Sequence, residues 1–243
     1  MKLFYRLFPK DLKITTFNKG WWFYIGLSAA GILLFTICGM SLPKEEKLRM
    51  IFVFSVLELI FLRLYKYRMV LNNDDYSYFD NLPCFLCNHS TILCIIASLT
   101  VNSHLMAFCI ILGTAGSLLA FVYPDKCVAN KPFYSFRTFG FYFYHATLIV
   151  SCLSFYTLGL YKKDLMDALW NVLILLTSAV LDHIINIILI KTKLNLDANY
   201  NFTIRPDNAF MEILYSFCPK RFLYMVPCLF IAAFLSFVVL LII

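Results

Sequence analysis

Seven long apolar stretches constrain this chain more than any other feature of its sequence. Each holds the roughly 20 mostly apolar residues that a helix needs to cross a bilayer. Apolar residue types make up 61% of the 243 residues and charged types only 14%, which is more apolar surface than one soluble core of this size can bury. We therefore predict an all-α polytopic membrane protein, a helical bundle of about seven transmembrane helices in a single domain over residues 20–243. The predicted spans are 20–40, 50–66, 82–101, 104–123, 138–160, 166–190 and 223–243.

The basic residues predict the orientation of the bundle. An excess of lysine and arginine in the inner segments indicates a cytoplasmic N-terminus. Residues 1–19, in which phenylalanine and leucine alternate with basic residues, are predicted to lie along the cytoplasmic surface. The net charge of +7 fits anionic headgroups and not nucleic acid, since no basic face alternates with stacking aromatic residues. In this orientation the outer side keeps only five of the 21 lysines and arginines: Lys44, Lys47, Arg49, Lys162 and Lys163.

Ionisable side chains inside the predicted spans are candidate functional residues, because each is costly in a membrane unless it is paired or hydrated. At about 1.5 Å per residue, Cys87 and His145 lie about 8–10 Å from the inner ends of their helices. Glu58, His183 and Asn186 lie at a similar depth, so groups from four helices share one level. The other candidates are His89, Asp182 and Cys84.

A cysteine and a histidine at the same predicted depth indicate nucleophilic catalysis. A cysteine attacks as a thiolate, and a nearby histidine can take its proton. Cys87 lies near the N-terminus of its predicted helix, where the helix dipole favours an anion. Glu58 or Asp182 is the candidate for orienting the imidazole of His145. Since the glycerol esters of phospholipids lie at this depth, an acyl ester is the expected substrate.

Other interpretations of the same residues stay open. A cysteine in a membrane helix can be a small apolar filler, and a histidine there can hold a backbone carbonyl. Intramembrane carboxylates and imidazoles are also typical of a non-enzymatic transporter or lipid-binding protein. The Cys84-x-x-Cys87 pair permits a membrane thiol oxidoreductase, although its predicted cytoplasmic side is reducing. No spacing of histidines and cysteines predicts a metal site, and we expect no metal and no cofactor.

Five segments, in order along the chain, carry a resemblance to a known family. Over roughly residues 50–240 the chain resembles the YwaF-type integral membrane proteins of bacteria, which are related to the transmembrane protein 164 family of phospholipid acyltransferases. The segments are the acidic Glu58; Leu82-Pro-Cys-Phe-Leu-Cys87; Gly113-x-x-Gly116 with Ala120 and Pro124-Asp125; Arg137 with an aromatic run and His145; and Asn199-Tyr-Asn-Phe202 with Arg205-Pro206.

The resemblance implies a multi-pass enzyme of the bacterial cytoplasmic membrane. Its partners would be phospholipid and lysophospholipid, between which a fatty acyl chain moves through a cysteine thioester; if water replaced the lysophospholipid, the enzyme would be a lipase. The resemblance implies Cys87 and His145 as catalytic residues, the pair that depth also selects, and Glu58 is expected to join them. The candidate substrate-binding residues are Arg137, Asn199, Tyr200, His183 and Asn186. Nothing in the sequence indicates a protein partner.

Overall fold

The computed structural model describes residues 8–9, 11–72, 78–124, 128–129 and 131–243. Within these ranges the long elements are all helices, and the only β contact is an isolated bridge between Lys13 and Pro132. The all-α prediction is therefore confirmed. The helices are α2 (Lys19–Met40), α3 (Lys44–Leu71), α4 (Leu86–Thr100), α5 (Ser103–Phe108), the π-helix η2 (Cys109–Gly113), α6 (Thr114–Val122), α7 (Phe136–Thr157), α8 (Asp167–Lys191), α9 (Ala209–Phe217) and α10 (Val226–Ile242). The 3-10 helices are η1 (Tyr78–Asn81), η3 (Tyr200–Phe202) and η4 (Leu223–Met225).

Five helical segments of the described chain are long and apolar enough to cross a membrane. They are α2, the continuous segment from α5 through η2 to α6, α7, α8, and η4 with α10. The second predicted span falls in α3, a continuous helix whose apolar run contains the charged residues Glu58, Arg63 and Lys66. The third falls in α4, which has only 15 residues. The count of seven spans and the orientation of the termini therefore stay predictions. Of the predicted surface segment, residues 1–7 and 10 lie outside the described residues.

Local side-chain caps explain where several helices begin. The side-chain oxygens of Asn18, Asn102, Ser135 and Asn208 each accept a hydrogen bond from the backbone N–H three residues later, at the starts of α2, α5, α7 and α9. Such caps satisfy one of the backbone donors that a helix leaves unpaired at its N-terminus.

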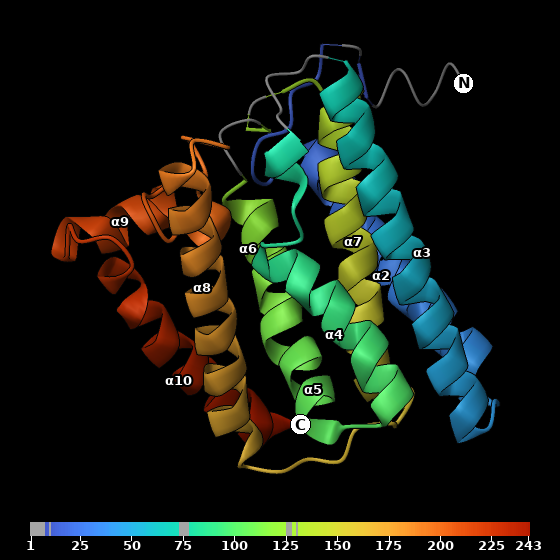
Figure 1. The fold of residues 1–243 in the computed structure, drawn as a ribbon. Helices are drawn as coiled ribbons and strands as arrows, with labels where there is room; N and C mark the ends of the chain where they lie inside the picture. The colour runs from blue at the N-terminus through green and yellow to red at the C-terminus, as the bar shows by residue number, and fades with distance from the viewer. Residues whose placement is uncertain (1–7, 10, 73–77, 125–127, 130) are drawn as a thin grey trace.

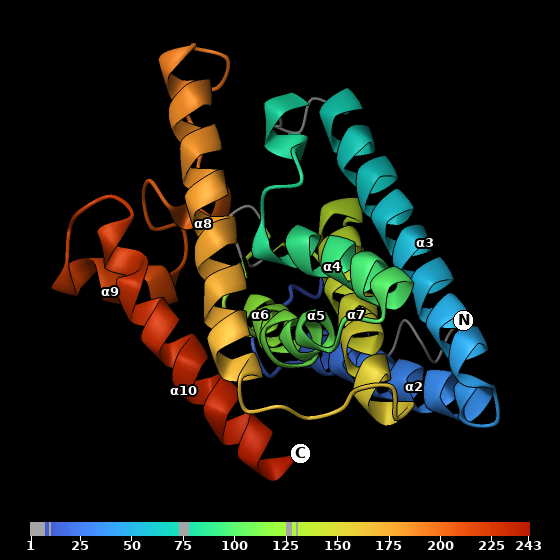
Figure 2. The same ribbon diagram turned by 60° about the horizontal axis from the view of Figure 1, so that its bottom comes forward.

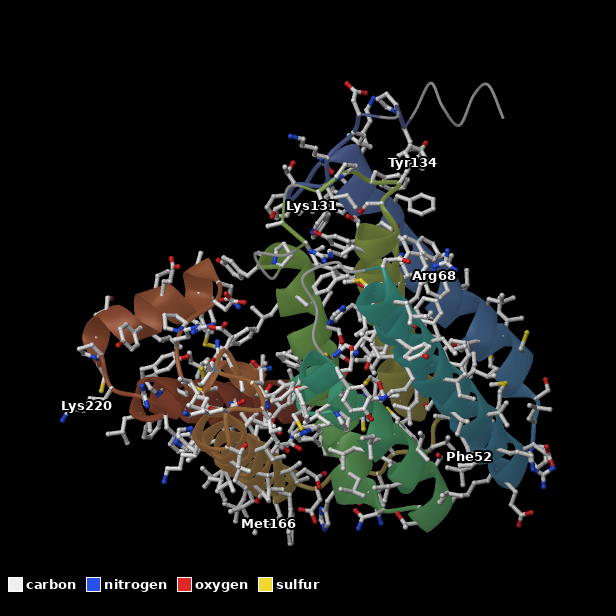
Figure 3. All side chains as sticks on the ribbon, turned by 45° about the horizontal axis from the view of Figure 1, so that its top comes forward. Phe52, Arg68, Lys131, Tyr134, Met166 and Lys220 are labelled. Atoms are coloured by element: carbon white, nitrogen blue, oxygen red, sulfur yellow. The ribbon has the colours of Figure 1, made fainter. Side chains whose placement is uncertain are left out.

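Helix α7 lies at the centre of the bundle and packs against α2, α3, α4 and α6, whereas α8 and α10 pack together on the other side (Figures 1 and 2). The α3–α7 contact depends on Gly140, because a Cβ atom there would lie 2.1 Å from the ring of Tyr65. At one end of the bundle the guanidinium of Arg68 lies over the ring of Phe136, 5.4 Å from its centroid. Figure 3 shows Arg68 and Lys131 toward this end and Met166 toward the opposite end.

Candidate active site

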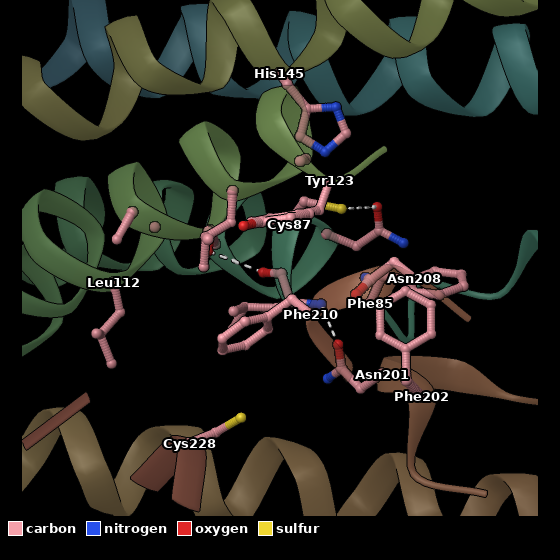
Figure 4. A pocket seen from close by; sticks show the side chains of 18 of the residues that line it. Phe85, Cys87, Leu112, Tyr123, His145, Asn201, Phe202, Asn208, Phe210 and Cys228 are labelled. Carbon is pink, nitrogen blue, oxygen red and sulfur yellow. Dashed lines mark hydrogen bonds between the residues drawn. The ribbon is translucent and has the colours of Figure 1, made fainter. Parts of the chain in front are cut away.

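A cavity of about 280 Å³ lies between the α8–α10 pair and the rest of the bundle. This volume is near the lower end of the range of small-molecule sites, about 300–1,000 Å³. Most of its lining is apolar, including Leu112 and Ala179. The polar and ionisable side chains in it include Lys66 and Asn88. Cys87, His145 and Asn201 also line it and are labelled in Figure 4.

Cys87 is in the first turn of α4. The turn is held from outside the helix, because the backbone N–H of Leu86 donates to Oδ1 of Asn201 at 2.7 Å. The carbonyl of Cys87 accepts hydrogen bonds from the hydroxyls of Tyr144 at 2.9 Å and Thr91 at 3.2 Å. Its Sγ donates to Oδ1 of Asn88 at 3.8 Å. The thiol therefore sits on a fixed backbone at a helix N-terminus, where a negative charge is favoured.

His145 enters the same cavity from α7 and is 5% exposed. Its Nδ1 lies 2.8 Å from the carbonyl oxygen of Phe141. A carbonyl only accepts hydrogen bonds, so Nδ1 carries the proton of the neutral imidazole. The lone pair then lies on Nε2, for which the described residues supply no hydrogen-bond donor. Figure 4 shows the side chains of His145 and Cys87 pointing into this shared space. This arrangement can take a proton from a thiol that lies within reach.

Glu58 lies on α3, outside this cavity, and is 4% exposed. The hydroxyl of Ser151 donates to its Oε2 at 2.6 Å, and its Oε1 has no partner among the described residues. Within the same part of the chain no hydrogen bond or ion pair joins Glu58 or Asp182 to His145. The sequence predicted a carboxylate as the acceptor that orients the imidazole, whereas the structure places the backbone carbonyl of Phe141 at Nδ1.

Asp182 is linked to the start of α4 through the side chain of Asn201. Its Oδ2 accepts from Nδ2 of Asn201 at 2.5 Å, and its Oδ1 lies 3.4 Å from Nε2 of His89. Asn201 in turn accepts from Leu86, so a chain of side chains joins α8 to the helix that carries Cys87. Asn201 adopts a left-handed conformation, with φ of 49°, which asparagine tolerates better than most residues.

Four of the predicted substrate-binding residues hold the loop over residues 199–205 instead of lining the cavity. Oδ1 of Asn186 accepts a hydrogen bond from the backbone N–H of Tyr200 at 2.8 Å, and its Nδ2 donates to the Tyr200 carbonyl at 2.9 Å. The hydroxyl of Tyr200 accepts from the N–H of Leu82 at 3.2 Å. Nδ1 of His183 lies 3.1 Å from the hydroxyl oxygen of Thr203. Asn199 closes the loop on itself, because its Oδ1 accepts from the N–H groups of residues 204 and 205.

Comparison with known families gives one match. The model of the TMEM164 family matches residues 15–242, nearly the whole chain. The chain belongs to the TMEM164 family. No curated protein and no solved structure matches it. Membership of the TMEM164 family and the apolar helices together make the chain a multi-pass membrane protein.

Arg137, the fifth predicted substrate-binding residue of this TMEM164-family chain, is not a lining residue of the cavity. Its backbone carbonyl accepts from the hydroxyl of Tyr65 at 2.9 Å, which joins α7 to α3. Among the described lysines and arginines, Lys66 lines the cavity, and its Nζ lies 5.1 Å from the centroid of the Phe85 ring. From the sequence alone, Lys66 is one of the inner basic residues that predict the orientation of the bundle. Its position at the inner end of the predicted span 50–66 could have identified it as a candidate site residue.

The Cys84-x-x-Cys87 pair is split between two environments in this member of the TMEM164 family. Cys84 is buried with Leu189, Ala198 and Tyr200, whereas Cys87 lines the cavity. Neither thiol is in a disulfide. In the part of the chain that the structure describes, no three histidine, cysteine or carboxylate side chains are grouped as metal ligands.

Proposed function

We propose that this protein transfers a fatty acyl chain from a phospholipid to a lysophospholipid through a thioester on Cys87. The observation that carries the proposal is that Cys87 and the Nε2 side of His145 open into one apolar cavity. An apolar cavity suits an acyl chain, and a cysteine beside a histidine is the arrangement of a covalent acyl carrier. Membership of the TMEM164 family agrees with a lipid-facing protein.

The proposed reaction has two halves. His145 Nε2 takes the thiol proton while Sγ of Cys87 bonds to the ester carbonyl carbon. The tetrahedral intermediate then collapses, the ester C–O bond breaks, and the leaving lysophospholipid oxygen takes the proton from His145. In the second half the hydroxyl of another lysophospholipid attacks the thioester, His145 accepts its proton, and the Cys87 thiolate leaves and is reprotonated. Water as the second acceptor would give a lipase.

Charge inside the cavity supports a phospholipid as donor. Lys66 is 9% exposed and lines the cavity with Cys87 and His145. A buried ammonium group favours a phosphate oxygen, which bears a full negative charge. The proposed headgroup contact therefore moves from Arg137, which the sequence suggested, to Lys66.

A second candidate is a lipid-binding or transport protein that does no chemistry. It is favoured by the apolar lining of the cavity alone, which would hold an acyl chain without using Cys87. The two candidates differ in whether a covalent bond forms, so one experiment separates them.

That experiment supplies the purified protein with a phospholipid donor and an isotopically labelled lysophospholipid, and follows the products by lipid mass spectrometry. Labelled diacyl product is expected from the wild type and not from Cys87→Ser. The matched control is Cys38→Ser, since Cys38 is exposed on α2, and it should transfer like the wild type. Product from Cys87→Ser would move the chemistry elsewhere, and no product from any form would favour the binding protein.

A further inference from the structure

Asn88 directly follows the proposed nucleophile, and its amide nitrogen has no partner in the part of the chain that the structure describes. It is 1% exposed and lines the cavity with Cys87 and His145. Its Oδ1 accepts from Sγ of Cys87 at 3.8 Å, so the amide group lies beside the thiol. No acceptor for its Nδ2 exists among the described residues.

An unpartnered buried donor is unusual, because most buried polar groups in proteins are hydrogen-bonded. Four other side chains of the described chain have a buried polar atom without a partner: Ser55, Glu58, Asn81 and Asn171. None of these four lines the cavity. Among these five side chains, only Asn88 lines the cavity, so its Nδ2 is the unpartnered donor nearest to the proposed nucleophile.

We propose that Nδ2 of Asn88 is an oxyanion-hole donor for the acyl ester. This assignment rests on the proposed function and adds a catalytic residue to it. When Sγ of Cys87 bonds to the ester carbonyl carbon, the π electron pair moves to the carbonyl oxygen, and the thiol proton goes to His145. The developing oxygen anion lies beside the attacking sulfur, and an N–H already in place stabilises it without reorganisation. On collapse the pair re-forms the carbonyl and the ester oxygen leaves with the proton.

The fixed backbone around Cys87 supports the role. The hydroxyls of Tyr144 and Thr91 bind its carbonyl, and Asn201 binds the N–H of Leu86, so the first turn of α4 is tied to two neighbouring parts of the chain. A donor on such a turn keeps its direction during the reaction. An oxyanion hole needs this, since its donors must already point to the place where the charge forms.

The test compares two rates at the same sulfur in Asn88→Leu, which keeps the side-chain size and removes the donor. The first rate is acylation of Cys87 by phospholipid, measured by mass spectrometry of the Cys87 peptide. The second is alkylation of Cys87 by iodoacetamide, which displaces iodide and forms no oxyanion. Acylation is expected to fall about 10²–10³-fold, as on removal of other oxyanion-hole donors, while alkylation stays within about threefold of the wild type.

The matched control is Asn171→Leu. Asn171 is a fully buried asparagine on α8 whose Nδ2 donates to Ser236 at 3.1 Å, outside the cavity. It should lower neither rate beyond its effect on the folded fraction. Asn88→Ala, which adds no bulk, replaces Asn88→Leu if that variant does not fold.

Each result has one meaning. Unchanged acylation in Asn88→Leu and Asn88→Ala, with an active wild type, would overturn the role of Asn88 and leave the proposed function standing. Equal losses of acylation and alkylation would also overturn it, because Asn88 would then act on the thiol itself. A wild type that alkylates at Cys87 but is never acylated would overturn the proposed function and the oxyanion assignment with it.

Discussion

Nδ1 of His145 lies 2.8 Å from the carbonyl oxygen of Phe141, one turn earlier on the same helix. The backbone of α7 thus fixes which imidazole nitrogen carries the proton, a task that hydrolytic triads give to a carboxylate. Because the acceptor is part of the helix, no substitution of a single side chain removes it. The roles of His145 and Glu58 can therefore be separated by mutation.

His145→Ala is expected to lower acyl transfer about 10²–10⁴-fold, the range for loss of a general base. Glu58→Gln is expected to lower it less than about tenfold, since glutamine can still accept from Ser151 and no hydrogen bond joins Glu58 to the imidazole among the described residues. The measurement is the initial rate of labelled diacyl product at equal amounts of folded protein. Equal losses in the two variants would show that Glu58 is part of the catalytic group.

Asn201 should tolerate glycine better than alanine. Either substitution removes the cap on Leu86 and the bond to Asp182, which is expected to cost about 0.5–2 kcal/mol for the cap alone. Alanine adds about 1–2 kcal/mol because φ at this position is 49°. Thermal unfolding in one detergent should give a higher midpoint for Asn201→Gly than for Asn201→Ala. At Asn72, where φ is −85°, glycine should give no such advantage.

Gly140→Ala should destabilise the contact between α3 and α7. The new Cβ would lie 2.1 Å from the Tyr65 ring, so the ring or a helix must shift, at a cost of about 1–3 kcal/mol. Gly26 is the matched control, because a Cβ there meets nothing within 4 Å, and Gly26→Ala should raise stability by about 0.4–1 kcal/mol. Unfolding midpoints of the two variants should move in opposite directions. A shift in the same direction would contradict the close approach of the two helices.

Tyr161 should make stability depend on alkaline pH. It lies in the loop between α7 and α8, and its hydroxyl donates to Oδ2 of Asp167 at 2.6 Å. Burial, and then the hydrogen bond and charge of Asp167, raise the pKa of Tyr161 above its usual value of 10.0. Because the folded form holds the phenol proton more tightly, the contribution is fully present below pH 10 and is lost as the pH rises toward the folded pKa.

Tyr161→Phe should therefore lower the unfolding midpoint at pH 8 and flatten its decline above about pH 10. The hydrogen bond to a carboxylate is expected to contribute about 1 kcal/mol. Tyr156→Phe, at a side chain that is 45% exposed, is the control and should leave the midpoint nearly unchanged. An identical pH profile for Tyr161→Phe and the wild type would contradict the coupling to Asp167.

The sequence predicted the helices better than their roles. Apolar stretches of about 20 residues identify α2, α7 and α8. A single segment that crosses a bilayer must form a helix, because only a helix pairs its backbone N–H and C=O groups within the segment. The apolar pattern predicts a span from residue 82, whereas α4 begins at Leu86. The backbone N–H of Leu86 donates to the side chain of Asn201, which lies more than a hundred residues away along the chain. A cap from so distant a residue cannot be recognised in the local sequence.

The sequence by itself determined that the chain is an all-helical, multi-pass membrane protein. It also placed Cys87 and His145 in separate segments of the chain, and their common depth stays a prediction, because α4 begins at Leu86 and not at residue 82. Hydropathy and residue spacing are local properties, so they are readable from one chain. Only the tertiary structure decided that these two side chains share a cavity with Asn88 and Lys66, while Glu58 faces Ser151 outside it. Packing against neighbouring helices sets the rotation of each helix about its own axis. The depth of a residue along its helix does not reveal that rotation, so it cannot predict which side chains face the same cavity.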